Sequence, residues 1–141
     1  MIILDTNVVS EMMRPEPDSR VIYWISNQPA QRVFLTSITV AELRFGVVIL
    51  PPGKRRERIA SAVDNMLREE FANRVLPFDY NAAYIYAEIG AGRRSIGKPI
   101  SHPDCQIAAI ARFHEAVLAT RNIDHFAQCE IALLNPWSQT P

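Results

Sequence analysis

The sequence contains only two cysteines, Cys105 and Cys129, and they stand far apart. This spacing argues against a disulfide framework and against a zinc knuckle, so we expect a reduced, cytoplasmic setting. No apolar run is long enough to cross a bilayer, and the opening run reaches Asp5 too soon for a signal peptide. The 15 Lys and Arg residues only balance the 15 Asp and Glu residues, so the basic surplus of many nucleic-acid-binding proteins is missing. Any contact with nucleic acid must therefore use a local patch.

Apolar residues make up 48% of the 141 residues, which is enough to bury a core without disulfides or a structural metal. The length fits one domain, so we expect residues 1–141 to form a single unit. Short runs of branched apolar residues predict buried strands at residues 2–4, 33–35, 75–76, 117–119 and 131–134. Helical spacing and helix-breaking residues predict helices at about 7–13, 18–27, 39–50, 55–68, 79–92 and 103–114. This alternation predicts an α/β fold whose mostly parallel sheet is covered by helices on both faces.

Four acidic residues occupy similar places in this pattern. Asp5 ends the first strand, Glu42 lies one turn into the helix after the second, Asp104 opens the last helix, and Asp124 follows the fourth strand. Sites in open parallel sheets form beyond the carboxyl ends of the strands, so we expect these acids to gather there. Clustered carboxylates repel one another, and a divalent cation such as Mg²⁺ relieves that repulsion. Such a metal activates water and binds phosphate, so the acids predict hydrolysis of a phosphodiester.

Each acid also has a structural interpretation. Asp5 is placed to cap the first helix. Thr39 and Glu42 have the spacing of a capping box, and Ser101 and Asp104 repeat that spacing. Capping alone does not require the acids to gather at one edge of the sheet. It is also compatible with metal binding, because an acid in the first helical turn can still point outward.

Four segments of the sequence form a distinctive series: MIILDTN at the start, SITVAELRFG around Glu42, GKPISHPDCQIAAIA around Asp104, and LATRNIDHF with NPW near the end. In their order and spacing they resemble PIN-domain toxins of the VapC and FitB type. The resemblance covers nearly the whole chain and implies a three-layer α/β/α fold with Mg²⁺- or Mn²⁺-dependent endoribonuclease activity. It also implies a homodimer and a cognate antitoxin that inserts a peptide over the active site, in a type II toxin–antitoxin system. Larger assemblies on DNA would form through the antitoxin, and no membrane contact is expected.

The resemblance assigns Asp5, Glu42 and Asp104 as the three core metal ligands. The fourth catalytic position is less regular. Family members often carry Asn or Asp after the Thr-Arg pair, which is Asn122 here, and then an Asp just before Phe, where this chain has His125. Asp124 is displaced from that place by one residue. We therefore expect one tightly held Mg²⁺, with Asp124 as the candidate fourth acid.

Other polar residues near the acids are candidates for supporting roles. Hydrogen bonds from neighbouring side chains orient metal ligands. The candidates for this role are Thr6, Asn7, Thr120 and Asn122. Arginine suits bidentate contact with phosphate, although a solvated face or ion pairs would explain any single arginine equally well. The candidates for lining an RNA path are Arg44, Arg93, Arg94 and Arg121. We expect Trp24 and Trp137 to be core or interface anchors.

Two other functions are compatible with parts of the sequence. An Asp after a first strand can act as the nucleophile of an aspartyl-phosphate phosphatase. Such sites usually carry a second acid two residues on, where this chain has Asn7. A binding module that kept the PIN fold but lost catalysis is the other alternative, suggested by the irregular segment between Asn122 and His125.

Overall fold

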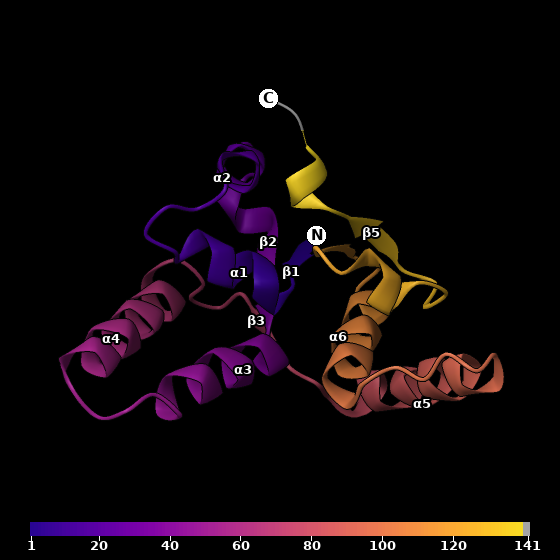
Figure 1. Ribbon diagram of the computed structural model, residues 1–141. Coiled ribbons are helices and arrows are strands. Elements are labelled where there is room, and N and C mark those ends of the chain that lie inside the picture. Colours follow the sequence, from indigo (N-terminus) through magenta and orange to yellow (C-terminus); the bar gives the residue numbers. More distant parts are fainter. Residues whose placement is uncertain (140–141) are drawn as a thin grey trace.

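The computed structural model describes residues 1–139 and has a five-stranded parallel sheet at its centre (Figure 1). The strands are β1 (Ile2–Leu4), β2 (Val33–Thr36), β3 (Val75–Leu76), β4 (Val117–Ala119) and β5 (Ala132–Leu134). Their order is β3-β2-β1-β4-β5, and every neighbouring pair is parallel. The predicted strands and the parallel sheet are therefore confirmed.

Within residues 1–139, six α-helices connect the strands. They are α1 (Thr6–Met12), α2 (Ser19–Ser26), α3 (Ser37–Val48), α4 (Lys54–Glu69), α5 (Tyr80–Ser95) and α6 (His102–Phe113). Short 3-10 turns are η1 (Ala30–Arg32), η2 (Ile123–Phe126) and η3 (Pro136–Ser138). Each predicted helix is present, with ends that differ by one to three residues. Across the described part of the chain, every helix is too short or too polar to span a bilayer.

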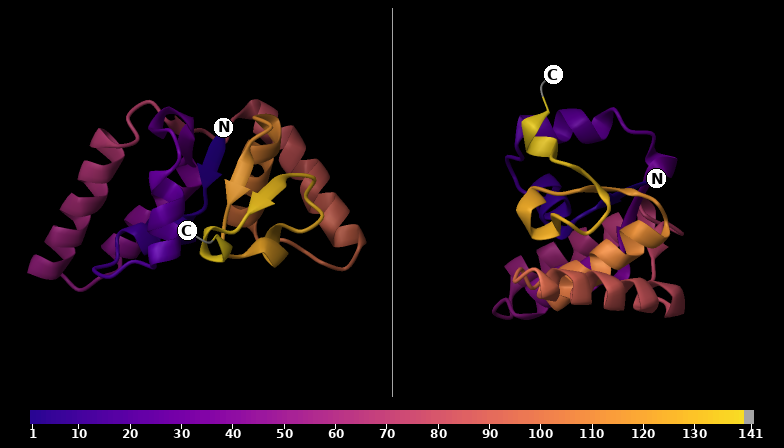
Figure 2. Two further views of the ribbon diagram at one scale, coloured as in Figure 1. Left: turned by 90° about the horizontal axis from the view of Figure 1, so that it is seen from above. Right: turned by 90° about the vertical axis from the view of Figure 1, so that its right-hand side faces the viewer.

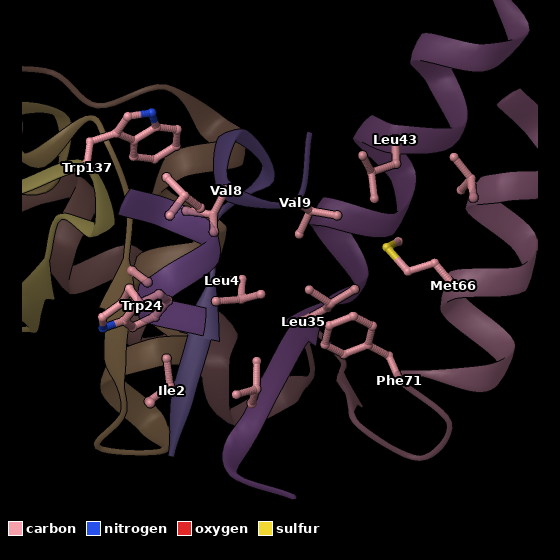
Figure 3. Packing of buried hydrophobic residues seen from close by; sticks show 14 of the residues in the cluster. Ile2, Leu4, Val8, Val9, Trp24, Leu35, Leu43, Met66, Phe71 and Trp137 are labelled. Atoms are coloured by element: carbon pink, nitrogen blue, oxygen red, sulfur yellow. The ribbon is translucent and has the colours of Figure 1, made fainter. Parts of the chain in front are cut away.

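Alternation along β1 separates the core into two layers. Ile2 and Leu4 pack with residues of α1, α2 and α4, whereas Ile3 packs with residues of α5 and α6 on the other face. Figure 3 shows Leu4 and Leu35 in the first of these layers. Figure 2 shows α4 and α5 at opposite edges of the molecule. Burial of both faces of β1 produces the three-layer α/β/α architecture, as expected for a continuous apolar strand.

The start of α3 corrects one expectation. The helix begins at Ser37, and its cap is Thr36, whose hydroxyl accepts a hydrogen bond of 3.1 Å from the Thr39 backbone N–H. The predicted capping box of Thr39 and Glu42 is therefore wrong, because both residues lie inside the helix. Glu42 has no capping role there, which leaves its carboxylate available for other contacts.

The strand order reverses at β1. The chain runs outward from β1 through β2 to β3 on one side, and β4 and β5 lie on the other. The carboxyl ends of β1 and β4 are adjacent, and the Asp5 backbone N–H donates a hydrogen bond of 2.9 Å to the Ala119 carbonyl. Ligand sites in open parallel sheets form at such a reversal.

Candidate active site

A cavity of about 490 Å³ opens at this reversal. Its wall includes Asp5, Glu42 and Asp104, which come from three different segments of the chain, and we name it the carboxylate cavity. Asp5 follows β1, Glu42 projects from α3, and Asp104 lies in the first turn of α6. The predicted convergence of these three acids in one cavity is therefore observed.

Asp5 is the buried member of the group, with 5% of its surface exposed. Its carboxylate accepts hydrogen bonds from the Thr6 backbone N–H at 2.8 Å and from the Thr120 hydroxyl at 2.7 Å. Burial raises the pKa of Asp5, the hydrogen bonds from Thr120 and Thr6 lower it, and the charges of Asp104 and Glu42 raise it again, with a net upward shift. The charged form of Asp5 is therefore disfavoured in the protein alone, and a nearby cation would favour it.

The hydroxyl of Thr6 orients Glu42. Its oxygen lies 2.8 Å from a Glu42 carboxylate oxygen and 3.0 Å from the Thr39 hydroxyl. Thr6 donates to the carboxylate, and its lone pairs can accept the Thr39 hydrogen. The exposed Glu42 side chain is in this way linked to the residue that follows Asp5.

Asp104 is positioned by the start of α6. Its backbone N–H donates a hydrogen bond of 3.3 Å to the hydroxyl of Ser101, which is the N-cap of the helix. The capping expectation for Ser101 is thus confirmed, and the Asp104 carboxylate still reaches the cavity. His125 lies on its other side, with Nδ1 3.5 Å from an Asp104 oxygen.

Asp124 does not join the other three acids. It is exposed on η2 and lines a neighbouring cavity of about 270 Å³, whose wall also includes Asp104 and His125. This placement corrects the expectation that all four acids gather in one cavity. His125, and not Asp124, makes the contact with Asp104. Both Asp124 and His125 therefore lie in the neighbouring cavity, and His125 is the one that reaches an acid of the candidate site.

Residues predicted to support the site surround Asp5. The Asn7 amide lies 3.3 Å from an Asp5 oxygen and 3.4 Å from the Thr120 hydroxyl. The Thr120 hydroxyl accepts a hydrogen bond of 3.0 Å from the backbone N–H of Asn122, which lines the cavity. The side-chain oxygen Oδ1 of Asn7 accepts a hydrogen bond of 3.3 Å from the backbone N–H of Arg121. These bonds join the segments after β1 and β4 around one carboxylate.

Three of the predicted RNA-path arginines are at the surface, in different settings. Arg121 lines the carboxylate cavity, and its guanidinium lies 5.0 Å from the centre of the Trp137 ring. Trp137 itself is buried, as predicted for an anchor. Arg44 forms an ion pair of 2.6 Å with Asp64 of α4. Arg94 is exposed near the C-terminal end of α5.

Arg93 does not fit an RNA path. Only 7% of its surface is exposed. Its guanidinium donates hydrogen bonds to the carbonyls of Lys98 at 2.7 Å, His125 at 2.8 Å and Ala127 at 3.0 Å. These donors are used within the protein, so the expectation that Arg93 contacts RNA is corrected. Arg93 instead joins the end of α5 to η2.

Two charged residues of the cavity wall were missed by the sequence analysis. Glu11 is 6% exposed and accepts hydrogen bonds of 3.2 Å from Arg14 and 3.0 Å from the Asp18 backbone N–H. Both Glu11 and Arg14 line the carboxylate cavity. The available signal was their spacing of three residues across the end of α1, because residues three apart at a helical turn lie close together.

The donor set is suited to Mg²⁺. In residues 1–139, no three His, Cys, Asp or Glu side chains are already arranged as a closed metal site. Mg²⁺ does not require such a cage, because it usually keeps several waters and binds one or two carboxylates. Asp5, Glu42 and Asp104 supply only oxygen donors, and the raised pKa of Asp5 arises partly from the other two charges. A divalent cation would relieve that repulsion, so the residues fit the ion.

Comparison with known proteins identifies the family. The PIN domain family model matches residues 2–131. Toxin FitB of Neisseria gonorrhoeae is 42% identical over 97% of this chain and 99% of its own length. VapC ribonuclease Y4jK of Sinorhizobium fredii is also 42% identical, over 97% of this chain and 98% of its own length. The chain therefore belongs to the PIN-domain family, and within it to the VapC and FitB type.

Solved structures agree with this assignment. A chain in the structure of FitAB bound to an IR36 DNA fragment superposes with a TM-score of 0.93 at 40% identity, and the match covers 100% of this chain and 99% of that one. A chain of VapBC2 from Rickettsia felis, bound to a DNA fragment from the promoter, has a TM-score of 0.81 at 27% identity, covering 96% and 98%. The predicted fold class is confirmed by these likenesses.

Proposed function

We propose that this chain is a Mg²⁺-dependent endoribonuclease and the toxin of a type II toxin–antitoxin system. The observation that carries the proposal is the convergence of Asp5, Glu42 and Asp104 in one cavity where the strand order reverses. Relatives that match almost the entire chain are named ribonuclease or toxin, which supports the same reaction class.

Asp5 and Asp104, with Glu42, would hold the Mg²⁺ ion, and Mn²⁺ would suit the same oxygen donors. Bound in this cavity, the ion supplies Lewis-acid chemistry at a phosphate and lowers the pKa of water for attack on phosphorus. Asp124 lies in the neighbouring cavity, so we assign it no ligand role and expect one ion.

The protein's own groups keep the carboxylates oriented. The Thr120 hydroxyl and the Thr6 backbone N–H hold both oxygens of Asp5, and they favour its charged form against the effect of burial. The Thr6 hydroxyl holds Glu42, and the Ser101 cap places the first turn of α6 so that Asp104 faces the cavity. Asn7 and Asn122 complete the polar wall. Each proposed ligand is therefore held by a hydrogen bond, which involves the carboxylate of Asp5 and of Glu42 and the backbone N–H of Asp104. Metal ligands are commonly oriented in this way.

A cognate antitoxin is the proposed protein partner. Solved structures of FitAB and VapBC match this chain, and three of them are named as bound to DNA. In this chain an apolar cavity of about 370 Å³ adjoins the carboxylate cavity, and the two share Thr6, Ser10, Arg14 and Glu42. An antitoxin peptide with apolar and basic side chains would suit the joined cavities. A homodimer, and assembly on DNA through the antitoxin, are further parts of this proposal.

The two alternatives have less support. In the phosphatase interpretation a second acid would stand at position 7, where the Asn7 amide donates toward Asp5 instead. The inactive binding module predicts no catalysis, and the three acids in one cavity give no reason for such a loss. A trapped phosphate on Asp5 would support the first alternative, and failure to bind Mg²⁺ or Mn²⁺ in calorimetry would support the second.

The test is cleavage of a structured RNA by the purified protein in Mg²⁺ or Mn²⁺. We expect cutting to stop in chelator and in the Asp5→Asn and Asp104→Asn variants. Asp64→Asn is the matched control, because Asp64 is an exposed acid of α4 outside the cavity. Cutting that persists both in chelator and in Asp5→Asn would overturn the metal-dependent mechanism.

A further inference from the structure

The charged groups of the carboxylate cavity are unbalanced. Its charged wall residues are the acids Asp5, Glu11, Glu42 and Asp104 and the bases Arg14 and Arg121. RNA brings further negative charge to this surface, at every phosphate. The formal net charge of the chain is zero, so no general excess of positive charge attracts RNA. The positive charge that the wall of this cavity supplies therefore comes from the two arginines.

Arg121 is held in place on two sides. Its backbone N–H donates to the Asn7 side chain at 3.3 Å, and its guanidinium lies 5.0 Å from the Trp137 ring centre. Trp137 is only 6% exposed, so the ring is a fixed support. A guanidinium over an aromatic face keeps its N–H groups in its own plane, where they can bind a phosphate in bidentate fashion. Arg121 is itself exposed, so these donors can reach a ligand.

Arg14 is held by a buried acid. Its Nη1 lies 3.2 Å from both carboxylate oxygens of Glu11, which is 6% exposed. The Arg14 side chain is 64% exposed, and within residues 1–139 its Nε and Nη2 make no hydrogen bond. Arg14 lines both the carboxylate cavity and the apolar cavity beside it. It is therefore an oriented donor at the junction of the two.

We propose that Arg14 and Arg121 bind RNA phosphates next to the one that is cut, and that Glu11 and Trp137 orient them for this contact. The inference rests on the proposed ribonuclease function and assigns it two substrate-binding residues. Arg44 and Arg93 are less suited, because neither lines the carboxylate cavity and Arg93 is buried. A pre-oriented guanidinium loses little freedom on binding, which favours these two positions over flexible surface cations.

The experiment measures RNA binding in a background that does not cut. Asp5→Asn protein in MgCl₂ is titrated against a short fluorescein-labelled single-stranded RNA of mixed sequence, over a range of KCl concentrations. We expect Arg14→Gln and Arg121→Gln each to weaken binding roughly three- to tenfold, and each to reduce the salt slope by about 0.7. Arg58→Gln is the matched control, because it removes the same charge from the exposed surface of α4.

Arg14→Lys and Arg121→Lys separate charge from geometry, and thermal melting checks that each variant is folded. We expect the lysine variants to regain the salt slope but only part of the affinity, because lysine lacks the planar fork. The inference would be overturned if Arg14→Gln and Arg121→Gln bound RNA as tightly as the Asp5→Asn background, or lost no more affinity than Arg58→Gln. If the background fails to bind RNA and the wild type fails to cut it, the proposed function fails too. If the wild type cuts RNA normally but the arginine substitutions leave binding by the Asp5→Asn protein unchanged, only the arginine assignment is overturned.

Discussion

The Thr120 hydroxyl donates a hydrogen bond of 2.7 Å to the Asp5 carboxylate, across 115 positions of sequence. The bond exists because β1 and β4 are parallel neighbours, so the residues that follow them emerge side by side. Burial raises the pKa of Asp5, and this hydrogen bond is the largest influence that lowers it. Thr120 therefore favours the ionised form of Asp5, which is the form that the proposed Mg²⁺ site requires.

Thr120→Val should impair catalysis without unfolding the protein. Valine has a similar shape but donates no hydrogen bond, so Asp5 loses both orientation and support for its charge. We expect Mg²⁺-dependent RNA cleavage to fall roughly 10- to 100-fold, the usual cost of removing a group that orients a metal ligand. Thr120→Ser keeps the hydroxyl and should retain most activity. Equal losses in the two variants, with circular dichroism unchanged, would show that the hydroxyl is not the important group.

Mg²⁺ should stabilise the folded protein in a way that depends on the cavity acids. An ion that binds only the folded state adds about 2.7 kcal/mol at a concentration of 100 times its Kd. We expect thermal unfolding of the wild type to shift upward with MgCl₂, and the shift to shrink in Asp5→Asn and Asp104→Asn. Asp64→Asn should respond as the wild type does. A shift of the same size in all four proteins would place the ion elsewhere.

Stability in chelator should carry a pH dependence that comes from Asp5. Because its pKa in the folded protein is raised above 3.8, the folded state holds this proton more tightly than the unfolded chain does. The free energy of unfolding therefore gains from Asp5 as the pH falls through its folded pKa toward 3.8, and loses that gain as the pH rises. Urea unfolding over this range should show the stability of the wild type rising relative to Asp5→Asn as the pH falls. A difference independent of pH would contradict the raised pKa.

Asp18 gives a contrast of opposite sign. Its pKa is lowered to about 2 by hydrogen bonds to the Arg20 side chain and backbone. The contribution of Asp18 is therefore present above 3.8 and is lost as the pH falls toward 2. Asp18→Asn should remove that acid-side loss while leaving the Asp5 dependence in place. The two aspartates can thus be distinguished in the same unfolding series.

Much of the fold could be predicted because its signals are local. Each strand is a short run of branched apolar residues, and burial of both faces explains why no polar alternation interrupts Ile2, Ile3 and Leu4. Helix ends were harder to predict. Thr36, Ser37 and Thr39 all carry hydroxyls, and the choice of Thr36 as cap depends on where its strand stops pairing with β3. That information lies in the sheet, not in the helix sequence.

In the candidate site, too, some contacts could be predicted from local sequence signals and others could not. Asp5, Glu42 and Asp104 could be placed together because each is tied to the end of a strand or the start of a helix. The contact of His125 with Asp104 could not be predicted, since it depends on the turn geometry of η2. Glu11 was missed because its burial results from the turn of the chain between α1 and α2, which brings the Asp18 backbone N–H to its carboxylate. Such contacts cannot be predicted from local sequence patterns, because they depend on how the chain turns between elements.

Arg93 provides the last prediction, on stability. Its buried guanidinium donates to three carbonyls, from Lys98, His125 and Ala127, and so fastens η2 to the end of α5. Arg93→Met fills much of the space but leaves these acceptors unpaired, so we expect a loss of about 3 kcal/mol in the free energy of unfolding. Arg93→Lys should lose less than Arg93→Met, because its ammonium can still donate to some of these carbonyls. It should not match the wild type, because one ammonium cannot span all three.

Arg94→Met is the matched control, since the neighbouring arginine is exposed on the same helix. Surface substitutions of this kind usually change stability by no more than about 0.5 kcal/mol. Urea unfolding of the three variants and the wild type measures the difference directly. If Arg93→Met were no less stable than Arg94→Met, the hydrogen bonds to η2 would contribute nothing to the fold. A loss of stability in Arg93→Met but not in Arg94→Met would show that Arg93 stabilises η2, the turn on which His125 contacts Asp104.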